Sequence, residues 1–119
     1  MEPVYVIDAL RTPVGRYGGS LSTVRPDDLL ALVIRAILQR NPAVTPALVN
    51  EVIAGAANQS GEDNRNVARM AALLAGLPVT VTGVTVNRLC ASGLQAVMDG
   101  SRQIACSDAD IIIACGVES

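Results

Sequence analysis

The 119-residue chain contains no histidine, no lysine, no phenylalanine and no tryptophan. Without lysine it can form neither a P-loop, which needs a phosphate-binding lysine, nor a lysine Schiff base. Without histidine it cannot complete a Ser-His-Asp triad, a Cys-His pair or a histidine-metal site from its own residues. Any cysteine or serine chemistry in this chain therefore takes its base from elsewhere.

Charge and cysteine content exclude further classes of protein. The net charge is −2, so nothing electrostatic favours a nucleic acid or an acidic membrane as partner. Cys90, Cys106 and Cys115 include no CxxC pair, which argues against a structural zinc site or a disulfide framework and for a reducing compartment. The N-terminus does not resemble a signal peptide, and no apolar run approaches the ~20 residues that span a bilayer. We expect a cytoplasmic protein without bound metal.

Four β-rich segments alternate with three amphipathic helices along the chain. Strands are predicted at residues 4–7, within 49–57, at 84–89 after a bend at Gly83, and at 110–116. Helices are predicted to begin at Pro26, at about residue 67 and after residue 93. The βαβαβαβ order predicts an α/β fold with a parallel sheet and helical crossovers. We expect the strand at 110–116 to be buried on both faces and the strand at 84–89 to lie at an edge.

Most candidate functional residues have simpler structural roles. The glycine-rich loop at residues 11–19 does not match the GxGxxG spacing of nucleotide-binding loops. The carboxylate pairs Glu62/Asp63 and Asp108/Asp110 are typical of solvated loops and helix caps. Cys115 lies within an isoleucine-rich strand, where a free cysteine acts as a small hydrophobe. Cys106 lies near a helix C-terminus, whose negative end opposes a thiolate.

Cys90 differs from the other two cysteines because it directly follows a predicted strand and precedes a predicted helix. A thiolate at a helix N-terminus is stabilised by unpaired N–H groups, and the same groups can bind a developing oxyanion. Ligands of parallel α/β sheets bind beyond the carboxyl ends of the strands, which is this position. The alternative is a buried cysteine that fills a tight turn, and the spacing alone leaves both interpretations open.

Residues 87–93 (NRLCASG) strongly resemble the nucleophile motif of the thiolase family, the acetyl-CoA C-acyltransferases. Residues 11–19 (RTPVGRYGG) are similar to the loop after the family's first strand, and residues 116–119 (GVES) to the segment closing its fourth strand. Residues 58–70 (NQSGEDNRNVARM) look most like the 3-oxoadipyl-CoA thiolase branch. The resemblance covers nearly the whole chain in order.

The resemblance implies a five-layered αβαβα protein of two similar halves. Residues 1–119 would then be an incomplete N-terminal domain, without the C-terminal domain. The implied reaction is thiolysis of a 3-oxoacyl-CoA to acetyl-CoA and a shortened acyl-CoA, or the reverse Claisen condensation. Cys90 would carry the acyl group as a thioester, with its own backbone N–H in an oxyanion hole. Coenzyme A enters as substrate, with no permanently bound cofactor, and no coenzyme A contact is assigned to a residue here.

The family's remaining catalytic groups, two histidines and a second cysteine, match no position in this chain, so the chain alone is expected to be inactive. The resemblance also implies that the strand at 84–89 pairs with its twin in a homodimer or tetramer. Residues 58–69, with Asn64 and Asn66, are expected to lie near the active-site mouth and to shape the acyl pocket. The alternatives are a ketoacyl-synthase-type condensing enzyme and a non-catalytic thiolase-like protein that binds acyl groups or only assembles. Cys90 argues against the non-catalytic alternative, since a carrier needs no thiol at a helix N-terminus.

Overall fold

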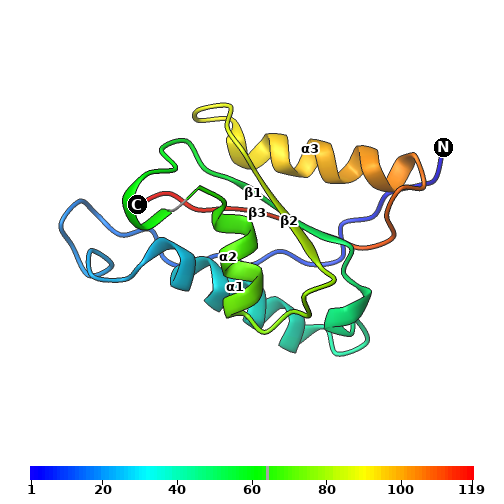
Figure 1. Ribbon diagram of the computed structural model, residues 1–119, viewed down its shortest axis with the longest axis horizontal. Coiled ribbons are helices and arrows are strands. Elements are labelled where there is room, and N and C mark those ends of the chain that lie inside the picture. Colours follow the sequence, from blue (N-terminus) through cyan, green and yellow to red (C-terminus); the bar gives the residue numbers. More distant parts are fainter. Residues whose placement is uncertain (64) are drawn as a thin grey trace.

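A computed structural model describes residues 1–63 and 65–119 and contains one parallel sheet (Figure 1). Its strands are β1 (Glu51–Gly55), β2 (Thr82–Val86) and β3 (Ile112–Gly116), in the order β2-β1-β3. Ile53 at the centre of β1 lies opposite Val84 on β2 and Ala114 on β3. The carboxyl ends of all three strands therefore meet at one edge, and the predicted α/β class is confirmed.

Helices cover both faces of this sheet. The helix α3 (Ser92–Ala105) packs on β1 and β3, while α2 (Val67–Leu74) packs on β2 and α1 (Pro26–Arg40) packs against α2 on the opposite face (Figure 1). Two short 3₁₀ turns, η1 (Pro46–Leu48) and η2 (Gly61–Asp63), lie in the connections. Within the described part of the chain, no helix is both long and apolar enough to cross a membrane.

The helix α1 illustrates how the sequence specifies these elements. Pro26 occupies its first turn, where the missing N–H costs nothing, and Asp27 and Asp28 complement the positive end of the helix dipole. Asp27 is buried and is compensated by Arg25, whose Nε lies 3.2 Å from the Asp27 Oδ1 atom. Leu30 and Ile34 share one face and enter the core with Val52, Val67 and Val81.

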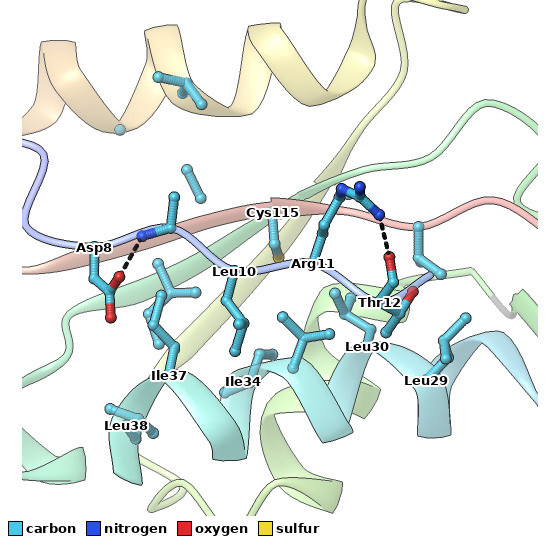
Figure 2. Close-up of a pocket in the computed structure, with 18 of the residues that line it drawn as sticks. Asp8, Leu10, Arg11, Thr12, Leu29, Leu30, Ile34, Ile37, Leu38 and Cys115 are labelled. Atoms are coloured by element: carbon cyan, nitrogen blue, oxygen red, sulfur yellow. Dashed lines mark hydrogen bonds between the residues drawn. The ribbon is translucent and has the colours of Figure 1, made fainter. Parts of the chain in front are cut away.

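The prediction of a strand at residues 4–7 is wrong. These four residues are exposed and lie outside the sheet, which has three strands among the described residues rather than four. The N-terminal segment, α1 and β3 line a cavity of about 1070 Å³ (Figure 2). A strand needs a neighbour at about 4.8 Å to form its ladder of hydrogen bonds, and residues 4–7 pair with no strand among the described residues.

The last strand, which borders the same cavity, is less buried than the sequence predicts. β3 is an edge strand whose Ile112 and Ile113 are half-buried and whose Ala114 is exposed, so it is not buried on both faces. β2 lies at the opposite edge, as predicted, but it begins at Thr82, and residues 87–89 belong to the following turn. Gly83 lies within β2 opposite Val52 and makes no bend, because its missing side chain instead admits the backbone of α2.

Candidate active site at the end of β2

Cys90 lies in the tight turn between β2 and α3, at the carboxyl edge of the sheet. Its side chain is exposed, and α3 begins two residues later at Ser92. The preceding residue, Leu89, has a φ of 50°, in the left-handed region that costs a non-glycine residue roughly 1–2 kcal/mol. The structure therefore places Cys90 at the strand–turn–helix position that the sequence predicts, on a strained backbone.

Hydrogen bonds from both flanks hold the strained turn. The Ser92 hydroxyl accepts from the Arg88 N–H at 2.7 Å and donates to the Leu89 carbonyl at 2.6 Å. The Asn87 Oδ1 atom accepts from the Leu89 N–H at 3.0 Å, while its Nδ2 donates to the Ala57 carbonyl at 2.9 Å. Both backbone polar groups of Leu89 are thus bonded, which compensates for the unfavourable φ.

The N-terminus of α3 gives the surroundings of Cys90 a partial positive charge. The first N–H groups of a helix have no partner within it. Here the N–H groups of Gly93 and Leu94 donate to no acceptor in the part of the chain that the structure describes. The Arg88 guanidinium instead donates to the Gln95 Oε1 atom on α3 at 2.5 Å. The unbonded N–H groups of Gly93 and Leu94 are therefore the candidate anion-binding groups near Cys90.

Hydrogen bonds connect the segments that follow the three strands, next to the Cys90 turn. The Glu118 carboxylate, just after β3, accepts from the N–H groups of Ala57 and Asn58 at 2.8 and 3.3 Å. Ala57 is also the residue whose carbonyl binds Asn87. Sequence reasoning missed Glu118, although a carboxylate at the end of a predicted strand is a signal for such a role.

The segment at residues 58–69 was predicted to lie at the mouth of the site, and the structure gives one of its residues a structural role. The Asn66 Oδ1 atom caps α2 by accepting from the Arg69 N–H at 3.3 Å, and it also accepts from the Thr85 hydroxyl at 2.8 Å. The Asn66 Nδ2 atom donates to the Gly83 carbonyl at 3.0 Å. Asn66 thereby joins α2 to β2. Asn64 lies outside the described residues.

Cys106 occupies the predicted environment, whereas Cys115 is half-buried on an edge strand rather than buried on both faces. Cys106 is the exposed C-cap residue of α3. Cys115 lies on β3 beside the cavity, with its Sγ atom 3.4 Å from the Ile53 carbonyl, and burial raises the pKa of its thiol to about 12. Within the described ranges, no three His, Cys, Asp or Glu side chains lie close enough to hold a metal ion.

Comparison with known proteins identifies close relatives. Residues 4–119 match the family described as the thiolase N-terminal domain. The β-ketoadipyl-CoA thiolase of Pseudomonas aeruginosa is 60% identical over 116 residues, which are 98% of this chain and 29% of that protein. The 3-oxoadipyl-CoA/3-oxo-5,6-dehydrosuberyl-CoA thiolase of Escherichia coli is 56% identical over 119 residues, 100% of this chain and 30% of that protein.

A solved structure agrees with these relatives. The crystal structure of the Bacillus anthracis acetyl-CoA acetyltransferase superposes with a TM-score of 0.87 and 42% sequence identity. The match covers 92% of this chain and 27% of that one. The chain thus spans less than a third of the length of the curated relatives that it matches.

Proposed function

Since the chain belongs to the thiolase family by its N-terminal domain, we propose that it is the part of an acyl-CoA thiolase that carries the nucleophile, Cys90. The observation that carries this proposal is the exposed Cys90 thiol beside the free N–H groups of α3. The first N–H groups of a helix stabilise a thiolate and can bind the oxyanion of a tetrahedral intermediate. The Cys90 N–H would contribute to the same oxyanion hole.

The proposed reaction is thiolysis of a 3-oxoacyl-CoA, with 3-oxoadipyl-CoA as the expected substrate because two relatives are named for it. The Cys90 thiolate attacks the C3 carbonyl, and the C2–C3 bond breaks. The electron pair leaves with the acetyl-CoA unit, which takes a proton at C2. The thiolate of free coenzyme A then displaces the acyl group from Cys90, which gives the shortened acyl-CoA. The reverse sequence is a Claisen condensation.

The proton transfers in this scheme need a general base at the Cys90 thiol and a general acid at C2 of the substrate. Deprotonation of a thiol and protonation of a carbanion require general acids and bases near neutral pH. The chain has no histidine and no lysine. We therefore expect the bases to come from the additional length that the relatives have, with residues 1–119 forming an N-terminal domain. Coenzyme A acts as a substrate, and no permanently bound cofactor is needed.

The assembly and location of the whole protein are part of the proposal. β2 is an edge strand, so the backbone groups along its outer edge can pair with a second copy, and Val84 on it is exposed. We expect a homodimer or tetramer formed through β2, located in the cytoplasm. A solution mass that shows only monomers of the full-length protein would contradict this assembly.

Two alternatives remain distinguishable from the thiolase proposal. A ketoacyl-synthase-type enzyme would use the same cysteine but would not cleave a 3-oxoacyl-CoA with free coenzyme A. A non-catalytic acyl-binding or assembly protein would not form an acyl-thioester. The identity to named thiolases and the exposed thiol at a helix N-terminus both favour the thiolase.

The test uses the full-length protein with 3-oxoadipyl-CoA and coenzyme A. We expect acetyl-CoA to form, and mass spectrometry of a rapidly quenched digest to find the acyl group on the Cys90 peptide. Cys90→Ala should abolish both signals, whereas the control Cys106→Ser should retain them. Turnover by the Cys90→Ala protein, or an acyl group on another residue, overturns the proposal.

A further inference from the structure

The central strand ends in a glycine that the first turn of α3 touches. Gly55 closes β1 and lies opposite Val86 on β2 and Gly116 on β3. A Cβ atom at Gly55 would lie 2.3 Å from the Ser92 carbonyl carbon and 2.5 Å from both the Ser92 oxygen and the Gly93 nitrogen. All three are backbone atoms of α3, so no side-chain rotation relieves the clash. Its φ is outside the left-handed region, so space rather than backbone freedom requires glycine.

A second glycine supports the same turn. A Cβ atom at Gly116 would lie 3.3 Å from the Gly55 carbonyl oxygen and 3.6 Å from the Gly93 Cα atom. The first contact is tight and the second is an ordinary van der Waals contact, so both are far less severe than those at Gly55. The first turn of α3 therefore packs against the ends of β1 and β3. The absence of a side chain at Gly55 determines how closely α3 approaches β1.

Ser92 connects this contact to the nucleophile. Its backbone is the part of α3 that lies against Gly55, and its side chain is buried. Its hydroxyl is the group that binds the Arg88 N–H and the Leu89 carbonyl on the other side of Cys90. Because Cys90 lies between these bonded residues, a displacement of Ser92 displaces the thiol as well.

We propose that Gly55 is a positioning residue for Cys90, and that Ser92 transmits its effect to the turn. A methyl group at position 55 would push the first turn of α3 outward by about 1 Å before an ordinary contact distance is restored. A misplacement of that size can cost about 10²-fold in rate. The effect on turnover depends on the proposed thiolase function, whereas the effect on the thiol itself does not.

The test compares Gly55→Ala with Gly83→Ala in the full-length protein. Gly83 is a matched control, because a Cβ atom there would lie 2.7 Å from the Arg69 backbone nitrogen, against α2 and not against α3. For each variant we would measure thermal stability, kcat and KM for thiolysis, and the rate at which iodoacetamide alkylates Cys90. We expect both variants to lose stability. Only Gly55→Ala should lower kcat by about 10²-fold, with little change in KM, and slow the alkylation several-fold.

Two further results decide the proposal. Ser92→Ala removes both hydroxyl hydrogen bonds without introducing a clash, so it should also slow the alkylation of Cys90. This variant keeps the test decisive if Gly55→Ala does not fold. Wild-type alkylation rates in Gly55→Ala and Ser92→Ala, or an equal loss in Gly83→Ala, would overturn the positioning role. If the unmodified protein has no thiolase activity, the proposed function fails, and the alkylation rates still test the positioning.

Discussion

The three cysteines differ because of where each lies relative to α3 and the core. Cys90 is exposed just before the N-terminus of α3, Cys106 is exposed at its C-terminal end, and Cys115 is half-buried on β3. The thiolate is the reactive form, and a helix favours it at the positive end and disfavours it at the negative end. Reactivity should therefore follow the order Cys90, Cys106, Cys115.

This order can be measured on the folded 119-residue chain with less than one equivalent of iodoacetamide at pH 8. We expect Cys90 to be labelled first, as found by peptide mapping. Cys115 should be labelled last, because a pKa of about 12 leaves only about one thiol in 10⁴ ionised at that pH. Circular dichroism would establish that the chain is folded. Labelling of Cys106 or Cys115 ahead of Cys90 would show that the helix-end argument is wrong.

The sequence predicts the place of Cys90 but not what holds it there. The strand–turn–helix pattern and the NRLCASG motif are local, so they are visible in the chain itself. The contact of Ser92 with Gly55 joins residues on two different elements, and the bond from Asn87 to Ala57 spans 30 residues. Such contacts depend on how β1 and β2 pair, which no local pattern contains. The left-handed Leu89 is likewise not predictable, because leucine normally avoids that region.

At the level of elements, Asn66 is expected to matter for stability. Asn66→Ala removes the N-cap of α2 together with the bonds to Thr85 and Gly83, so we expect a loss of about 1–2 kcal/mol in the free energy of unfolding. Urea denaturation of the 119-residue chain measures it. Asn66→Asp keeps the capping oxygen but loses the donor to the Gly83 carbonyl, so it should lower the free energy of unfolding by less than Asn66→Ala does. Equal stability of Asn66→Ala and the unmodified chain would contradict the capping role.

The same substitution tests the predicted role of residues 58–69 in the acyl pocket. In the full-length protein, Asn64→Ala or Asn66→Ala should change the relative kcat/KM values among acyl-CoA substrates. A uniform decrease for all substrates would instead indicate that Asn66 acts only through the packing of α2 on β2.

The attachment of the N-terminal segment to α1 should depend on pH. A hydrogen bond from Asn41 lowers the pKa of Asp8 below its ordinary value of 3.8, and the Ala9 N–H and the charge of Arg40 lower it further. A carboxylate with a lowered pKa stabilises the fold above pH 3.8, and this contribution is lost as the pH falls through the lower, folded-state value. The attachment should therefore weaken in acid.

Hydrogen exchange of residues 2–12 measures this attachment. We expect faster exchange below about pH 3.8, after correction for the intrinsic pH dependence, and no such transition in Asp8→Asn. If Asp8→Asn shows the same pH-dependent transition, another carboxylate is responsible for the transition.

The elements were predictable to the extent that their signals are local. Pro26 with two acidic residues marks the start of α1, and the spacing of Val67, Met70, Ala71 and Leu74 marks α2. The failure at residues 4–7 has a physical reason. β-branched residues indicate an extended backbone, but a strand also needs a partner, and this segment pairs with no strand of the described sheet. The burial of β3 was overestimated for the same reason.

At the scale of the whole molecule, the 119-residue chain on its own should have no thiolase activity. Cys90 supplies a nucleophile, but the chain contains no histidine or lysine to move protons at the thiol or at the substrate. We expect no acetyl-CoA from 3-oxoadipyl-CoA and coenzyme A, measured against the full-length protein as positive control. Turnover that disappears in Cys90→Ala would mean that a carboxylate of this chain serves as the base.

The cavity between the N-terminal segment, α1 and β3 also has a calorimetric consequence. Figure 2 shows Leu10 and the α1 side chains Ile34 and Ile37 around this space. The accessible surface is 7330 Å² for a mass of 12.3 kDa, where a compact monomer of that mass has about 6100 Å². Part of the apolar surface is therefore already exposed to water in the folded chain. Unfolding then exposes a smaller additional apolar area. The heat capacity of unfolding should fall clearly below the ~1.6 kcal/mol/K typical of 119 residues, which flattens the stability curve of this chain against temperature.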